Sequence, residues 1–174
     1  MKKNLLASVF LIITLAGCKK DTDENFHVSF SVNGANKSYK GHVFAHKETV
    51  SGFSQLVVNG STSATSYNDY MGIYLDNYPA GNNFSTGEYT DAGTTYSLLS
   101  TYANGGSEYE AGQSIAEDAV SYGVTITNHF KINITQLDAE TIRGTFSGDF
   151  YPGGNVRSTG KITITNGEFY AKFQ

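Results

Sequence analysis

The feature that most constrains the fold of this chain is an alternation of apolar and polar residues. Phe26, Val28, Phe30 and Val32 alternate with polar residues, and the same pattern recurs across residues 142–150. Successive side chains of a β-strand point to opposite faces, so a period of two predicts strands with one buried face and one wet face. No stretch after residue 25 carries a long apolar period of 3.6 residues, so an all-β domain is expected.

The alternation and the turn residues between its runs predict about ten strands. They are expected at residues 26–32, 39–46, 52–59, 70–76, 88–90, 94–101, 124–134, 142–150, 162–165 and 169–173. Asn-Gly pairs favour hairpin turns, so Asn33-Gly34 and Asn166-Gly167 are expected to reverse the chain, the second within a C-terminal meander. A short helical turn is expected near residues 114–119. We predict an antiparallel β-sandwich, with a closed β-barrel as the alternative.

The N-terminus has the organisation of an export signal. Lys2 and Lys3 precede an apolar run at residues 5–15 that is too short to span a bilayer, which needs about 20 residues. The run ends in Leu15-Ala16-Gly17-Cys18, which resembles the bacterial lipobox at all four positions. The resemblance implies that residues 1–17 are a signal peptide and that the Cys18 thiol carries the lipid that anchors the protein to a membrane.

Residues 18–25 are expected to form a charged tether between this anchor and the folded domain. The segment has no apolar residue after Cys18, so it cannot pack into a core. It resembles the Lys- and acid-rich signals that follow the lipidated cysteine of some surface-exposed Gram-negative lipoproteins. We therefore expect an outer-membrane protein displayed at the cell surface. The alternatives are the periplasmic face of the membrane and a plain solvated spacer.

The remaining composition suits one small acidic domain at residues 26–174. Once Lys2 and Lys3 leave with the signal peptide, 10 of the 12 basic residues remain against 16 acidic ones, which gives a net charge of −6. That balance argues against nucleic acid as a partner. Cys18 is the only cysteine of the chain, so no thiol remains for a disulfide or for catalysis.

Part of the domain resembles small, uncharacterised all-β lipoproteins of Gram-negative bacteria. The resemblance lies in the first predicted hairpin, at residues 30–34, and in two C-terminal stretches, at residues 142–148 and 162–169. These motifs consist of alternating strand residues and turns. They imply the fold and carry no activity with them.

Residues with the capacity for catalysis show no recognisable arrangement. His42 and His46 stand four apart, which in a strand separates them by about 13 Å, too far to share a metal. We therefore expect no metal site and no cofactor. The acidic residues could pair as the two carboxylates of a glycosidase, and they are Asp69, Asp76, Glu88, Glu108 and Glu110. A hydrolase of this kind is one alternative function, but solvated surface acids are the simpler interpretation, so no enzyme is predicted.

The tyrosine-rich middle of the chain is the candidate ligand-binding surface. A tyrosine ring offers a flat apolar face for stacking and a hydroxyl for hydrogen bonding. The candidate residues are Tyr67, Asn68, Asp69, Tyr70, Tyr102 and Tyr109, which are expected in or beside loops. The function predicted from these residues is a non-catalytic binding module for a glycan or a surface protein. A purely structural envelope lipoprotein, with all rings in its core, is the other alternative.

Overall fold

The structure is a computed structural model that describes residues 25–50, 52–66, 68–77, 83–93 and 96–174. The signal peptide, Cys18 and Tyr67 therefore lie outside the described residues. In chain order the elements are β1 (His27–Val32), β2 (Ala35–Tyr39), β3 (His42–Val50), β4 (Phe53–Ser61), β5 (Asp69–Asn77), β6 (Gly87–Thr90), β7 (Tyr96–Asn104), β8 (Ser107–Gly112), α1 (Gln113–Tyr122), β9 (Lys131–Leu137), β10 (Thr141–Pro152) and β11 (Ile162–Lys172).

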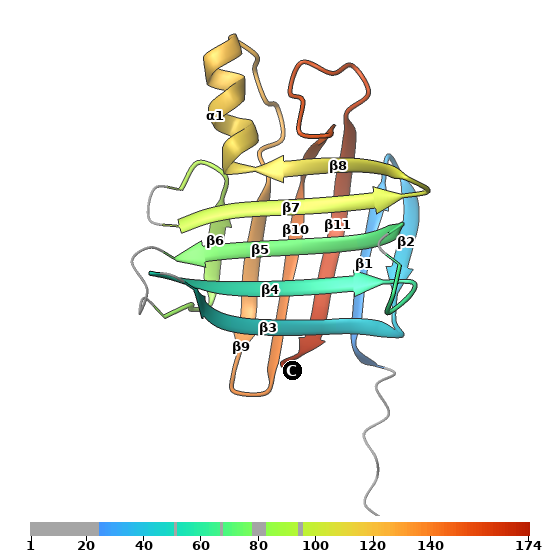
Figure 1. The fold of residues 1–174 in the computed structure, drawn as a ribbon, viewed down its shortest axis with the longest axis vertical. Coiled ribbons are helices and arrows are strands. Elements are labelled where there is room, and N and C mark those ends of the chain that lie inside the picture. Colours follow the sequence, from blue (N-terminus) through green and yellow to red (C-terminus); the bar gives the residue numbers. More distant parts are fainter. Residues whose placement is uncertain (1–24, 51, 67, 78–82, 94–95) are drawn as a thin grey trace, which may run out of the picture.

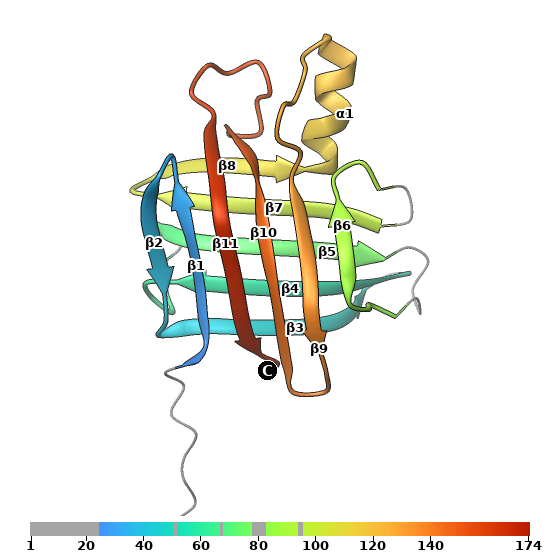
Figure 2. The same ribbon diagram turned by 180° about the vertical axis from the view of Figure 1, so that it is seen from behind.

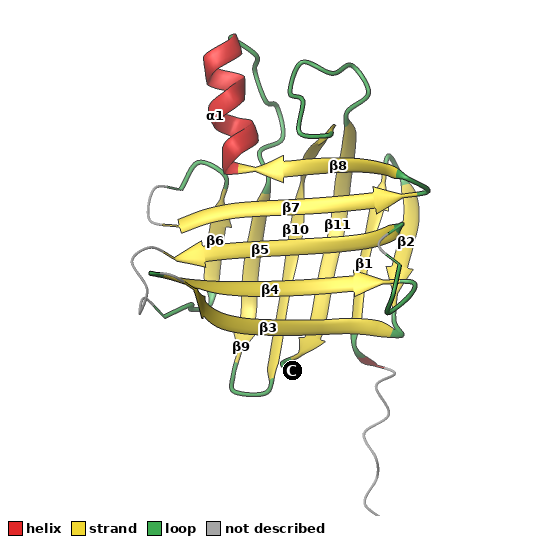
Figure 3. Ribbon diagram, viewed as in Figure 1, coloured by secondary structure: helices red, strands yellow, loops and turns green. Residues whose placement is uncertain are grey.

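The strands form two layers that cross each other (Figures 1 and 2). The front layer has the order β8-β7-β5-β4-β3, and the back layer has the order β2-β1-β11-β10-β9-β6. The pairs between named strands are antiparallel, as the alternation predicted. The prediction of an all-β antiparallel fold is confirmed, and almost every element in Figure 3 is a strand.

Strand β10 joins the two layers into one continuous 11-stranded sheet. Its first part pairs with β9, from Ile142 to Ser147, and its end pairs with β8, at Tyr151 and Pro152. A strand that changes sheets makes a corner of the kind found in crossed β packings. The sheet therefore nearly closes on itself, and β3 is left as the edge strand of the front layer.

The core lies between the layers and is rich in aromatic rings. These rings come from Phe and Tyr, because the chain has no tryptophan. Phe30 of β1 packs edge-on against Tyr102 of β7, with 5.4 Å between ring centroids, so this contact joins the back layer to the front. Phe30 also contacts Phe146 of β10 at 5.8 Å. A smaller cluster of Ile115 and Ala119 with Tyr151 and Val156 fixes α1 above the sheet.

Several strand boundaries differ from the sequence prediction. The strand expected at residues 124–134 is wrong in its first half, because residues 124–130 lie outside the strands and β9 begins at Lys131. The single strand expected at residues 39–46 is wrong, because Lys40 and Gly41 separate β2 from β3. The break lets β2 pair with β1 in the back layer while β3 pairs with β4 in the front layer. Strand β8 was not predicted, and the helical turn expected near residues 114–119 is the centre of the ten-residue α1.

The hairpin expected at Asn166-Gly167 is also wrong. Strand β11 runs through these residues, and its register against β10 shifts between Phe146 and Gly148. Asn166 takes a left-handed conformation, with φ of 52°, so the extra residue forms a β-bulge. The uninterrupted β11 can then pair with β1 on its other side, which brings the two ends of the domain together.

Candidate functional site

Two of the predicted site residues belong to the core. The ring of Tyr102 is 2% exposed, and Tyr109 of the neighbouring strand stacks on it with 6.2 Å between centroids. Burial, followed by the charge of Asp69, raises the pKa of Tyr102 to about 12. Both tyrosines lie on strands β7 and β8 rather than in loops, and both contribute to packing.

Asp69 and Asn68 connect strands at one end of the front layer. The hydroxyl of Tyr39 donates to Asp69 over 2.6 Å, and the ammonium of Lys37 lies 3.4 Å from the same carboxylate. Burial and this hydrogen bond raise the pKa of Tyr39. The carbonyl oxygen of Asn68 accepts from the amide of Gly105 at 2.8 Å. Asp69 therefore ties β2 to β5.

Tyr70 lies in a different setting, on the outer face of the front layer. Met71 and Ile73 of β5 point into the core, so Tyr70 and Tyr74, which alternate with them, point outward. The register places His42 of β3 and Ser61 of β4 in line with Tyr70. Side chains from three strands therefore meet on this face.

Together with a neighbouring loop, these side chains line a pocket of about 370 Å³. That volume lies within the range of small-molecule sites. We call it the tyrosine pocket, and its named members are His42, Phe44, Asn59, Ser61, Tyr70 and Tyr74. Aromatic rings alternate in it with an amide, a hydroxyl and an imidazole. Such a lining can stack on a flat ligand and hydrogen-bond to its edge.

Gly72 leaves the space in which one of these rings lies. A Cβ atom built on Gly72 would come within 2.7 Å of the Tyr74 hydroxyl and 2.9 Å of the same ring. The ring of Tyr74 therefore lies over the backbone of its own strand rather than standing away from it. Val57, the cross-strand neighbour of Tyr74, is only 7% exposed although it is absent from the core cluster.

The surroundings of Tyr70 keep its hydroxyl neutral. Burial, followed by the charges of Glu108 and Tyr74, raises the pKa of Tyr70 to about 12. The Tyr70 hydroxyl therefore stays protonated at physiological pH, and its hydrogen bond with Glu108 engages it within the fold. Among the described residues that line the tyrosine pocket there is no Asp, Glu, Lys or Arg, so the pocket suits a neutral ligand rich in hydroxyls better than an ion.

Buried charge elsewhere serves the fold. The carboxylate of Asp149, which is inaccessible to solvent, contacts Lys161 at 2.6 Å and Thr163 at 2.8 Å. Burial alone would raise the pKa of Asp149, but these hydrogen bonds and one from Asn128 lower it. Asp91 likewise accepts from the backbone amide of Phe130 at 2.8 Å. Both carboxylates fix the segment that links α1 to β9.

The acids considered for catalysis are spread over the sheet. Asp76 accepts from the Gln55 amide at 2.8 Å, and Glu88 forms an ion pair with Lys131 at 3.3 Å. Within the described part of the chain, no three His, Cys, Asp or Glu side chains gather where they could hold a metal ion. No described helix is long and apolar enough to cross a membrane.

Sequence reasoning found Tyr70 but missed most of its neighbours in the pocket. His42, Phe44, Asn59 and Ser61 lie in β3 and β4, far along the chain from the tyrosine-rich stretch. Phe44 precedes the buried Ala45, and Asn59 and Ser61 flank the buried Gly60, so the outward direction of these three side chains follows from the alternation. Their proximity to Tyr70 depends on strand register, which the sequence alone does not specify.

The chain matches no known protein-family model, no curated protein and no solved structure. Any functional conclusion therefore has to rest on the geometry of its own residues.

Proposed function

We propose that this protein is a non-catalytic, glycan-binding lipoprotein of the bacterial outer membrane, displayed at the cell surface through a lipid on Cys18. The observation that carries the proposal is the tyrosine pocket. It gathers Phe44, Tyr70 and Tyr74 from β3 and β5 around the polar groups of Asn59 and Ser61.

The chemistry of the pocket matches a neutral sugar. A pyranose has one face of C–H groups, which packs against an aromatic ring, and a rim of hydroxyls. Asn59 offers both a donor and an acceptor, and the Ser61 hydroxyl, which donates to the carbonyl oxygen of Ser63 at 2.8 Å, can still accept. Tyrosine supplies this contact area at low conformational cost, because its side chain has only two rotatable bonds to fix.

A binding role is favoured over hydrolysis by the surroundings of the acids. A glycosidase needs two carboxylates facing one another across the scissile bond, separated by about 5–9.5 Å. Asp69, Asp76 and Glu88 are each engaged by an amide, a hydroxyl or an ammonium group at separate places on the sheet. None of these three lines the tyrosine pocket.

The anchoring part of the proposal rests on the lipobox-like Leu15-Ala16-Gly17-Cys18. The first described residue, Asn25, follows Cys18 by seven positions, and such a segment spans at most about 25 Å. The domain would therefore stay close to the membrane. Two or three acyl chains on one cysteine hold a protein to a bilayer almost permanently, because each buried methylene contributes about 0.8 kcal/mol.

A glycan array tests the binding proposal. The full chain, purified in a neutral detergent, is expected to bind a subset of neutral glycans, and Tyr74→Ala is expected to weaken that binding at least tenfold. Tyr170→Ala is the matched control, because Tyr170 is a half-buried outward-facing ring on the back layer, tilted against Phe26 with 4.9 Å between ring centroids.

Each outcome of this experiment either supports or contradicts glycan binding in the tyrosine pocket. Loss of binding in Tyr74→Ala with retention in Tyr170→Ala supports the pocket. Equal loss in both variants, or no glycan bound by the wild-type protein, contradicts the proposal. Release of shortened products from a bound glycan would identify a hydrolase instead.

A further inference from the structure

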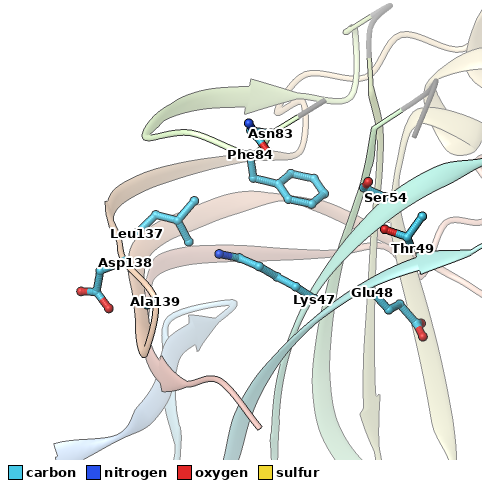
Figure 4. A pocket seen from close by; sticks show the side chains of 9 residues that line it. All are labelled: Lys47, Glu48, Thr49, Ser54, Asn83, Phe84, Leu137, Asp138 and Ala139. Carbon is cyan, nitrogen blue, oxygen red and sulfur yellow. The ribbon is translucent and has the colours of Figure 1, made fainter. Parts of the chain in front are cut away.

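A second cavity opens at the corner where the sheet is not closed. Its volume is about 560 Å³, and it lies between edge strand β3, the start of β4, the segment before β6 and the turn between β9 and β10 (Figure 4). We call it the Lys47 pocket. The side chains that line it are Lys47, Glu48, Thr49, Ser54, Asn83, Phe84, Leu137, Asp138 and Ala139.

The ammonium group of Lys47 is the cation of this pocket. Lys47 lies two residues after the buried Ala45 on β3 and so points to the same inner side of the front layer, where its stem reaches the ring of Phe173. The Nζ atom lies 4.2 Å from that ring centroid. Among the described residues it has no ion pair and no hydrogen bond. Partial burial lowers the pKa of Lys47, and the charge of Asp138 opposes this effect.

The two carboxylates of the lining are engaged elsewhere. Glu48 lies 3.5 Å from the imidazole of His46, and its carboxylate points away from the cavity in Figure 4. Asp138 accepts hydrogen bonds within its own turn, from the amides of Glu140 and Thr141 at 2.9 and 2.8 Å and from two side chains. These bonds hold the pKa of Asp138 well below its usual range. The oxygens of Asp138 are therefore engaged within its own turn, although its charge still acts on Lys47.

The remaining walls differ from one another in polarity. Phe84 and Leu137 form an apolar wall that is continuous with the core, and the ring of Phe84 points into the cavity. The hydroxyl of Thr49 lies on the opposite wall, and Asn83 stands at the mouth. A ligand that fits needs one apolar face, hydroxyl groups along its edge and one negative charge.

We propose that the Lys47 pocket binds a sugar acid, with the carboxylate on the Lys47 ammonium and the ring face on Phe84. The hydroxyls of the sugar meet Thr49 and Asn83. This site is distinct from the tyrosine pocket, since no residue lines both. It adds a charged ligand class to a protein whose other pocket suits neutral sugars. Each binding proposal can therefore be contradicted by experiment without affecting the other.

The test compares three ligands of graded chemistry by calorimetry on the full chain in a neutral detergent. Glucuronate carries the charge and the ring, glucose has the ring without the charge, and octanoate has the charge on an apolar chain. We expect glucuronate to bind at least tenfold more tightly than glucose. The binding should weaken as salt is raised, because exposed charges are screened.

Variants separate the pocket from the rest of the molecule. Lys47→Gln removes the charge from an exposed side chain. It should leave the melting temperature unchanged and should weaken the binding of glucuronate at least tenfold. Tyr74→Ala, in the other pocket, should leave glucuronate binding as it was. Equal affinity for glucose and glucuronate, unchanged binding in Lys47→Gln, or no glucuronate binding at all would overturn the proposal. Binding of octanoate alone would also overturn it and would identify a lipid carboxylate site.

Discussion

At the scale of single residues, stability depends on close contacts between aromatic rings and glycines. Gly144 faces the core beside Phe169, and a Cβ atom on it would lie 2.5 Å from the Phe169 ring. The sequence pattern places this glycine on the apolar side of its strand, where a glycine indicates the close approach of a neighbouring strand or ring, or a local bend. The same pattern placed Phe146 on the buried face, where it is 3% exposed.

Phe146→Ala is expected to lower the free energy of unfolding by about 3–5 kcal/mol, because it leaves a cavity beside Phe30 and Phe169. Thr145→Ala, one residue away on the exposed face, should cost well under about 1 kcal/mol. Denaturant melts of both variants make the comparison. A larger loss in Thr145→Ala would mean that the two faces of β10 are reversed.

Asp149 gives a prediction with a pH dependence. Its pKa in the folded protein is held below the unfolded value of about 3.9, so its stabilising effect is complete above about pH 5 and is lost as pH falls through the folded pKa. Asp149→Asn should cost about 3 kcal/mol at pH 7, the lower end for a buried pair, since Lys161 is 39% exposed.

Urea melts of Asp149→Asn and the wild-type protein at pH 7 and pH 3 test this effect. The difference between them should shrink at pH 3. Glu88→Gln is the control, because Glu88 and Lys131 form an exposed pair that contributes less than about 1 kcal/mol. An equal cost of Asp149→Asn at both pH values would contradict the assignment.

At the scale of elements, alternation was a good guide wherever a strand has one buried and one exposed face. Strands β1, β5 and β10 lie within a residue or two of their predicted bounds. Strand β8 was not predicted, because it has few apolar side chains and follows Gly105-Gly106. An Asn-Gly pair suits a hairpin and a bulge equally, so the sequence alone could not tell which one residues 166–167 form.

The bulge makes a prediction at this scale. A Cβ atom on Gly167 would overlap the carbonyl oxygen of Phe146, so Gly167→Ala should destabilise the protein by about 1–3 kcal/mol. Asn166→Gly keeps the left-handed conformation available and should change stability by less than about 1 kcal/mol. Thermal melts of the two variants, interpreted with hydrogen exchange of β11, test the bulge. A milder effect in Gly167→Ala than in Asn166→Gly would contradict it.

At the scale of the whole molecule, the two ends of the domain have different surroundings under the proposed anchoring. The chain enters β1 at the end of the molecule opposite α1 (Figure 1). A lipid on Cys18 would place that end toward the membrane, with α1 pointing away. The tyrosine pocket lies on the outer face of the front layer.

Cys18→Ser tests the anchor, because a hydroxyl does not replace the thiol in lipid transfer. The variant should incorporate no labelled fatty acid and should no longer be found in the membrane fraction. Protease treatment of intact cells tests the display, and it should remove the wild-type domain. Full labelling of the serine variant would contradict the anchor, while protection in intact cells with cleavage after lysis would indicate the periplasmic face.

The candidate site shows why sequence could predict only part of it. Tyr70 was identified from its residue type, but Tyr102, which has the same chemistry, is buried in the core, and the partly buried Tyr109 packs against it. The difference between them comes from which face of which strand each one occupies. The partners of Tyr70 on β3 and β4 depend on register across the front layer, a property of the folded sheet.

The most direct test of the tyrosine pocket is the glycan affinity of Gly72→Ala. This substitution removes no side chain, and alanine is no worse than glycine in a strand, so stability should be unchanged. The added Cβ atom displaces the ring of Tyr74, because it would lie within 2.9 Å of that ring. The account predicts that Gly72→Ala melts like the wild-type protein and binds its glycan at least tenfold more weakly. An unchanged affinity would contradict it.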